Sequence, residues 1–111
     1  MVTQIKINED TIYTHVETLP AFPGDWMRFL ERNLQYPESA IGIEVQGTVI
    51  VQFIVDKEGN LSEVKTLNNP GGRLAEEAVG IIRKSPAWRP AEQNGRRVKY
   101  LHVQTITFRL Q

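Results

Sequence analysis

The sequence predicts a small α+β domain in which two helices pack on one face of a three-stranded antiparallel sheet, in the order α-β-β-α-β. Two segments carry apolar residues at helical spacing, and the others read as strands bounded by turn residues. The chain has 111 residues, 41% of them apolar and 23% charged, which suits one globular domain. We divide it into an extended N-terminal segment over residues 1–20 and a folded domain over residues 21–111.

The first helix is expected to begin after Asp25, a good N-cap residue that follows the turn at Phe22-Pro23-Gly24. Its apolar stripe consists of Trp26, Phe29, Leu30 and Leu34. Pro37 should end it at Tyr36, because the residue before a proline avoids helical backbone angles. A further helical turn is expected over residues 38–41.

The clearest strand runs from Gly47 to Asp56, where apolar residues alternate in the manner of a buried sheet face. The segment Asp56-Lys57-Glu58-Gly59-Asn60 has the composition of a hairpin turn, with Gly59 free to take a positive φ. Leu61 to Leu67 should therefore pair back on the first strand.

The main helix is expected over Arg73 to Ser85, stopped by Pro86. Its core-facing residues are Leu74, Ala78, Ile81 and Ile82. Trp88 lies between two prolines, and this stiff extended segment should lay the indole across the core.

The last strand, Arg97 to Leu110, follows an Asn94-Gly95 turn and is long for its sheet. It could reach roughly 45 Å, against about 33 Å for Gly47 to Asp56. An overhang of this kind leaves N–H and C=O groups unpaired, as a template for another strand. The alternative is that residues 97–101 form a loop. A switch of apolar parity along the strand indicates a bulge or a change of covering layer near Gln104.

Catalytic chemistry is not indicated, and we expect a binding module that is not an enzyme and uses no cofactor. The chain lacks cysteine, and His15 and His102 have no second metal ligand at suitable spacing. Pro70-Gly71-Gly72 lacks the lysine of a phosphate-binding loop, so it reads as a turn. Residues 67–111 carry eight Lys/Arg against three Asp/Glu, which could steer an acidic partner or reflect solvated surface, but no basic-aromatic motif indicates nucleic acid.

These segments together resemble the C-terminal domain of TonB, in the form common among energy transducers of Bacteroidetes-type bacteria. The resemblance covers Leu19 to Leu110 and rests on the order and spacing of several short motifs. They are Leu19-Pro20-Ala21-Phe22-Pro23-Gly24, Asn33-Leu34-Gln35-Tyr36-Pro37, Gly47-Thr48-Val49-Ile50-Val51-Gln52-Phe53, Pro86-Ala87-Trp88-Arg89-Pro90-Ala91 and Ile106-Thr107-Phe108-Arg109-Leu110.

The resemblance implies a periplasmic domain, anchored in the inner membrane in the full-length protein, that binds outer-membrane active transporters. In that family the domain adds the transporter's TonB box as a strand beside its last strand, and a proton-driven inner-membrane motor complex supplies the force. The segment before the Tyr-Pro motif also contacts the transporter. The candidate partner-binding residues are Asn33, Leu34, Gln35, Tyr36, Pro37, Val98, Tyr100, Leu101, His102, Val103, Gln104, Thr105 and Ile106.

The sequence departs from the family's pattern in two respects. No membrane anchor or proline-rich spacer is present, which fits an excised domain or a variant anchored otherwise. Ala75 follows Leu74 where the family often has aspartate. Related domains also occur on membrane-bound sensor peptidases, so a sensory or scaffolding role without transport is the alternative function. A homodimer through the last strand is a further possibility.

Overall fold

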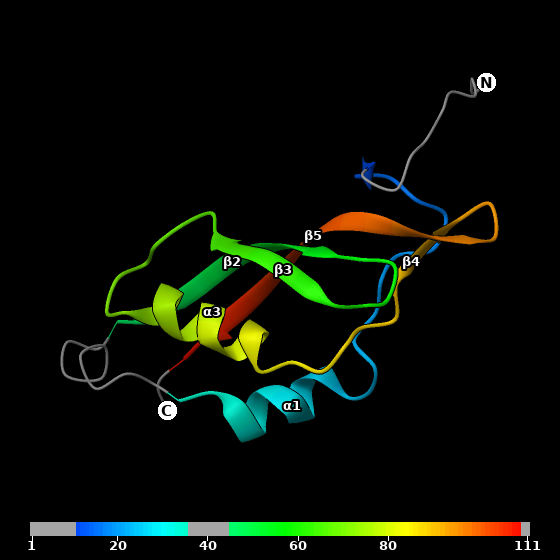
Figure 1. The fold of residues 1–111 in the computed structure, drawn as a ribbon. Helices are drawn as coiled ribbons and strands as arrows, with labels where there is room; N and C mark the ends of the chain where they lie inside the picture. The colour runs from blue at the N-terminus through cyan, green and yellow to red at the C-terminus, as the bar shows by residue number, and fades with distance from the viewer. Residues whose placement is uncertain (1–10, 36–44, 110–111) are drawn as a thin grey trace.

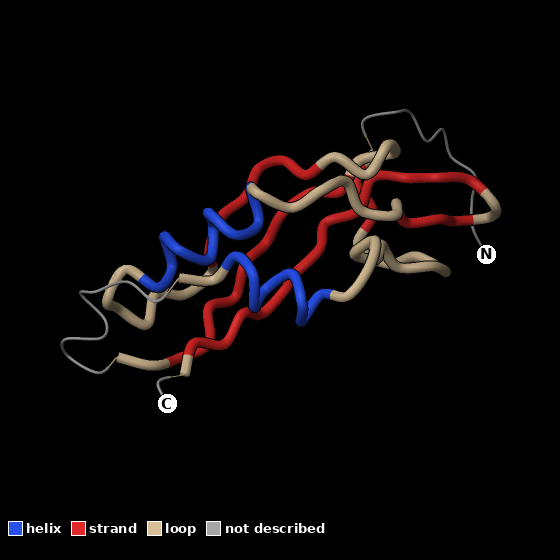
Figure 2. Tube along the Cα trace, turned by 90° about the horizontal axis from the view of Figure 1, so that it is seen from below, coloured by secondary structure: helices blue, strands red, loops and turns tan. Residues whose placement is uncertain are grey.

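The computed structural model describes residues 11–35 and 45–109. Along the chain, these residues form β1 (Ile12–Tyr13), α1 (Trp26–Asn33), β2 (Gly47–Val55), β3 (Leu61–Thr66), α3 (Leu74–Arg83), β4 (Ala91–Gln93) and β5 (Arg96–Phe108) (Figure 1). The sheet has the strand order β1-β5-β2-β3, and β4 forms a hairpin with β5. Both helices lie on the same face of the sheet, as Figure 2 shows from below.

The predicted α+β class with two helices is confirmed for the described residues, but the three-stranded sheet and the order α-β-β-α-β were wrong. The described sheet has five strands, and β1 pairs with β5 in parallel. The two missed strands, β1 and β4, are two and three residues long. Strands this short show no alternation of apolar and polar residues, so the pattern could not reveal them. The helical turn expected over residues 38–41 lies outside the described residues.

Strand β2 supplies one wall of the core, as its alternation predicted. Val49, Val51, Phe53 and Val55 are fully buried. They pack against α3 through Leu74, Ala78, Ile81 and Ile82, and against Leu30 of α1. The predicted core-facing stripe of the second helix is therefore confirmed.

Local capping and turn chemistry accounts for the ends of these elements. The Asp25 carboxylate accepts a hydrogen bond from the Arg28 N–H at 3.1 Å, which confirms Asp25 as the N-cap of α1. In the β2–β3 hairpin, the Asp56 carboxylate accepts from the N–H groups of Glu58 and Asn60 at 2.9 and 2.8 Å. Gly59 takes a positive φ of 87°, as predicted.

Trp88 closes the core between the two helices and the sheet, and its indole is only 5% exposed. The ring meets Phe53 edge to face, with centroids 5.4 Å apart, and also contacts Phe22 and Trp26. Its Nε1–H donates to the Ser85 Oγ at 2.9 Å, and its backbone N–H donates to the Gly59 carbonyl at 2.9 Å. The predicted placement of the indole across the core is confirmed.

The close approach of Trp88 to the hairpin yields a stability prediction. A Cβ on Gly59 would lie 1.9 Å from the Trp88 carbonyl oxygen, at a backbone φ of 87°. Gly59→Ala should therefore lower the free energy of unfolding by about 3 kcal/mol or more, measured by urea denaturation.

Gly71→Ala is the matched control, because Gly71 also has a positive φ, 100°, but nothing lies within 4 Å of its added Cβ. This variant should lose only about 1 kcal/mol. Equal losses in the two variants would contradict the steric role of the Gly59–Trp88 contact.

Candidate partner-binding edge

Strands β2 and β5 pair over an unbroken antiparallel register, from Gly47 opposite Phe108 to Val55 opposite Tyr100. The bulge predicted near Gln104 is therefore absent from this ladder. The other explanation, a change of covering layer, agrees with the structure: Leu101 and Val103 lie on the sheet face that the helices do not cover, whereas Ile106 and Phe108 face the core. Neither set requires a break in the strand.

The direction of the backbone groups follows from the contacts of β2 on its other side. The Ile50 carbonyl accepts from the Leu67 N–H at 2.8 Å, and the Ile50 N–H donates to the Asn68 side chain at 2.8 Å. Ile50, and every second residue of β2 counted from it, therefore direct their N–H and C=O groups towards β3. In an antiparallel ladder these directions alternate along a strand. Val49, Val51, Phe53 and Val55 therefore direct theirs towards β5.

The same alternation applies to β5. The residues of β5 that lie opposite Val49, Val51, Phe53 and Val55 direct their backbone groups towards β2. They are Ile106, Gln104, His102 and Tyr100. The intervening residues direct their backbone groups away from β2, and we call this side of the strand the docking edge. It comprises Val103, Thr105, Thr107 and the C=O group of Leu101, since the parallel pairing of Tyr13 with Tyr100 turns the Leu101 N–H towards Tyr13.

Within the described residues no strand lies beside β5 on this side beyond Tyr100, where the pairing with β1 ends. The Thr105 carbonyl accepts a long contact of 3.4 Å from the Gln104 side-chain amide. Val103 and Thr105 are exposed, with 49% of the Val103 residue surface accessible. This edge can therefore accept an added strand through main-chain hydrogen bonds.

The overhang predicted at the start of the last strand is not open, so that part of the prediction was wrong. β4 pairs with Arg96, Arg97 and Val98, and β1 pairs with Lys99 and Tyr100. The alternative of a loop over residues 97–101 is also wrong, because all of these residues lie in β5. The backbone available for pairing lies further along the strand, opposite β2.

The two faces of the docking edge differ chemically. On the uncovered face, Leu101 lines a shallow hollow of about 290 Å³ with Ile54 and Gln52 of β2 and residues of β3. On the helix face lie His102, Gln104 and the fully buried Ile106. An added strand would place alternate side chains against these two surfaces.

His102 is held in a largely apolar setting beside the edge. Its ring centroid lies 5.1 Å from that of Trp88 and 5.4 Å from that of Phe53. Burial lowers the pKa of His102 from the ordinary value of 6.5, and a 3.2 Å hydrogen bond with the Gln104 side chain opposes this shift. The imidazole is therefore favoured in its neutral form.

The second group of candidate residues lies in the helix layer. The Asn33 side chain donates to the Phe29 carbonyl, and the Gln35 N–H donates to the Glu77 carboxylate of α3 at 3.0 Å. Leu34 is the C-cap of α1 and packs against the core. None of these described hydrogen bonds reaches β5, so the structure does not join this group to the docking edge. Tyr36 and Pro37 lie outside the described residues.

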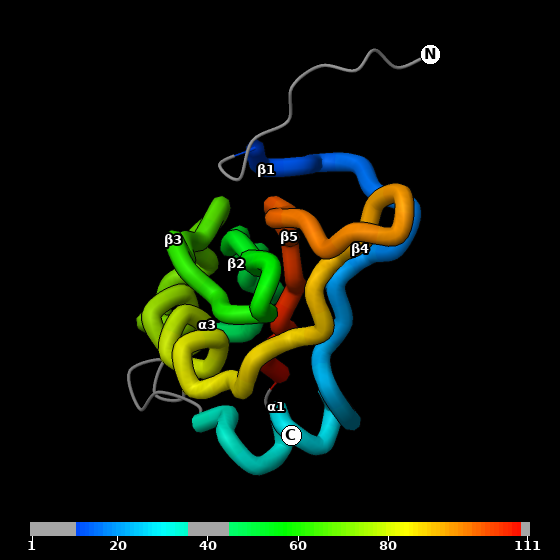
Figure 3. The backbone as a smooth tube through the Cα atoms, turned by 45° about the vertical axis from the view of Figure 1, so that its right-hand side comes forward, coloured from blue at the N-terminus to red at the C-terminus, as the bar shows by residue number. Residues whose placement is uncertain are grey.

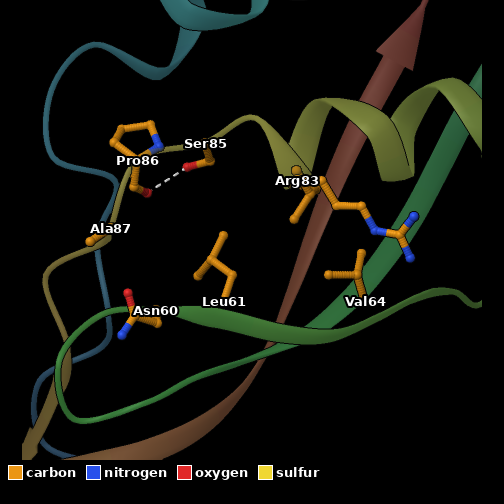
Figure 4. A pocket seen from close by; sticks show the side chains of 8 residues that line it. Asn60, Leu61, Val64, Arg83, Ser85, Pro86 and Ala87 are labelled. Atoms are coloured by element: carbon orange, nitrogen blue, oxygen red, sulfur yellow. Dashed lines mark hydrogen bonds between the residues drawn. The ribbon is translucent and has the colours of Figure 1, made fainter.

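A hollow of about 260 Å³ between β3 and the end of α3 offers little for chemistry (Figure 4). Its hydroxyl belongs to Ser85, which donates to the Pro86 carbonyl and accepts from the Trp88 indole. In the described part of the chain, no group of three or more His, Asp or Glu is placed to hold a metal ion. None of the helices described there is long and apolar enough to cross a membrane.

Sequence reasoning missed three residues of this region. Ile12 and Tyr13 border the docking edge through β1, and Thr107 belongs to it. A β-branched and an aromatic residue side by side at positions 12 and 13 were the only local signal for β1. Thr107 could have been added to the candidate residues, because it follows Val103 and Thr105 at a spacing of two and so directs its backbone groups to the same side.

The family model described as Gram-negative bacterial TonB protein C-terminal matches residues 32–110. The match includes the helix-layer candidates Asn33, Leu34 and Gln35 and the whole of β5. No curated protein matches the chain.

The environment of His102 predicts a pH dependence of stability. As the pH falls, His102 takes up its proton at a higher pH in the unfolded chain than in the native protein, because its native pKa is lowered below 6.5. The free energy of unfolding should therefore fall as the pH drops from 7.5 through 6.5 towards the native pKa, and level off below it. Urea denaturation between pH 7.5 and 5.5 measures this dependence.

His102→Gln should remove this component of the pH dependence. His15→Gln changes an exposed histidine and is the matched control, which should keep it. A wild-type profile that matches that of His102→Gln over this range would contradict the assignment.

Proposed function

The chain belongs to the TonB C-terminal domain family, and from this premise we propose that it couples energy to outer-membrane active transporters by binding their TonB box along the docking edge of β5. A periplasmic location and a coupling role without catalysis are typical of this family, and this supports the proposal. The proposal adds the partner and the mode of binding: β-strand addition in the service of nutrient uptake.

The observation that carries the proposal is the direction of the β5 backbone. Val103, Thr105 and Thr107 turn their N–H and C=O groups away from β2, on a side where the described residues supply no strand. Backbone pairing provides affinity for many sequences, and alternate side chains provide selectivity. These are the requirements of a domain that serves several transporters.

The anchoring of β5 suits a role in transmitting force. One side of the strand is paired with β2 from Tyr100 to Phe108, and its start is paired with β4. A partner strand aligned with β5 would be pulled in shear, which loads several hydrogen bonds together. Peeling would break them one at a time and would resist less.

We place a second transporter contact at Asn33, Leu34 and Gln35, continuing into Tyr36 and Pro37. Gln35 is exposed, and its backbone is fixed to α3 through Glu77. A short segment fixed at the end of a helix can present side chains to a partner with little loss of entropy on binding.

In the full-length protein, an inner-membrane anchor would connect this domain to the proton-driven motor complex. We place the folded domain at residues 21–111 and the connection in residues 1–20, of which Ile12, Tyr13 and Thr18 also pair with the domain. The docking edge could also pair with the same edge of a second copy, which would give a homodimer that competes with the transporter.

The proposal predicts the effect of a proline in the docking edge. The N–H of Val103 faces away from β2, so Val103→Pro removes a donor from the edge without removing one from the β2 ladder. The folded variant should bind a synthetic TonB-box peptide at least about tenfold more weakly than wild type, measured by titration calorimetry.

Val103→Thr is the matched control, because it keeps the N–H and the side-chain shape, and it should bind nearly as wild type does. Amide signals of Val103, Thr105 and Thr107 should shift when the peptide binds. Wild-type affinity in a folded Val103→Pro variant would rule out docking at this edge. Retained peptide binding with loss of self-association would assign the edge to a homodimer.

A further inference from the structure

The N-terminal strand β1 occupies the same side of β5 as the docking edge. Ile12 pairs with Lys99 and Tyr13 with Tyr100, in parallel, and the sheet order places β1 across β5 from β2. Figure 3 shows β1 beside the upper part of β5. The docking edge therefore begins where β1 ends.

The chain leaves this edge immediately after β1. Thr14 and His15 form a bend, and Thr18 then bridges Glu92 of β4 with two backbone hydrogen bonds of 3.0 and 3.1 Å. The continuation of β1 thus turns towards β4 and does not follow β5 past Tyr100.

Side-chain contacts hold this path in place. The Glu17 N–H donates to the Gln93 side chain at 2.8 Å, and the Glu17 carboxylate accepts from the Asn94 N–H at 2.8 Å. Ala21 and Arg89 exchange two further backbone hydrogen bonds, of 3.0 and 2.7 Å. The segment that follows β1 is therefore fixed to β4 and its flanking chain, and β1 is kept beside Lys99 and Tyr100.

We infer that β1 is a specificity-determining element, a stop that sets the register and length of the partner strand. This inference rests on the proposed function. A partner strand can pair from the Leu101 carbonyl to Thr107, a seat of about seven residues or ~23 Å. A longer pairing towards the start of β5 must displace Ile12 and Tyr13, because one side of a strand accepts one neighbour.

The stop also selects among transporter segments. A segment whose strand-forming residues match the seat keeps all of its hydrogen bonds with β1 in place. A segment with two more strand-forming residues at the β1 end gains nothing from them, since the outward backbone groups of Lys99 and the Leu101 N–H are already paired with β1. Selection by length in this way does not depend on side-chain chemistry.

The test compares three synthetic peptides on the wild-type chain and on variants of its N-terminal segment. One peptide is a seven-residue TonB-box segment, and the others carry two added valines at its N-terminal or its C-terminal end. The proteins are the wild-type chain and Tyr13→Pro, in which a proline disfavours the pairing of β1. Affinities are measured by titration calorimetry, and chain folding is checked by amide spectra.

In wild type, the extension that points towards β1 should leave the affinity of the seven-residue peptide unchanged. In Tyr13→Pro, the same extension should raise it about tenfold, because the outward backbone groups of Lys99 and the Leu101 N–H become available for pairing. The other extension should have the same effect in both proteins. The peptide end whose extension raises the affinity for Tyr13→Pro is the end next to β1, and this identifies the direction of the bound strand.

His15→Pro, with a proline in the bend beyond the last β1 pair, is the matched control and should behave as wild type. If Tyr13→Pro does not fold, Tyr13→Gly serves in its place, because glycine also weakens a strand. Equal extension effects in wild type and in the folded β1 variant would overturn the register stop. Failure of the seven-residue peptide to bind wild type would overturn the proposed function itself, and this inference with it.

Discussion

The antiparallel ladder between β2 and β5 is the interaction on which the remaining structure depends. Its nine pairs run without a register shift from Gly47 opposite Phe108 to Val55 opposite Tyr100. Because side chains and backbone groups both alternate along a strand, this one register decides which side chains enter the core and which backbone groups of β5 face outwards. A slip by one residue would exchange the buried and exposed sets, which the fully buried Val51 and Phe53 could not tolerate.

Packing on the helix face holds that register. Trp88 contacts Phe53 of β2 and His102 of β5, so one indole bridges neighbouring strands. Its backbone is fixed to Gly59 in the hairpin and its ring nitrogen to Ser85 after α3. No strand among the described residues lies beside the outward edge of β5 from Val103 to Thr107. A strand held firmly on one side, with its other edge free of described neighbours, is the arrangement that strand addition requires.

The sequence could reveal elements whose residues repeat with a clear period. The alternation over Gly47 to Asp56, the stripe of Leu74, Ala78, Ile81 and Ile82, and the Asp56 to Asn60 turn each have a local physical signature. Strands β1 and β4 carry no such signature, because two or three residues cannot express a period and their pairing depends on distant partners.

The same limit explains the error about which backbone groups of the last strand are open. The length of β5 was correctly judged unusual, but only the sheet order shows that β4 and β1 cover its start and that no other described strand lies beside residues 103–107 on the side away from β2. The role of Asn33 to Gln35 came from family resemblance alone, and the hydrogen bonds that connect this segment to α1 and α3 could not be inferred from spacing.

The central claim is that β5 has one paired and one open side over residues 101–107 in the free protein. Amide hydrogen exchange, followed residue by residue by NMR, tests it most directly, because exchange is slow only where an N–H is held in a stable hydrogen bond. The account predicts alternation: slow exchange at His102, Gln104 and Ile106, and fast exchange at Val103, Thr105 and Thr107. Uniformly slow exchange along the strand would show that a further strand already covers this side, and would contradict the account.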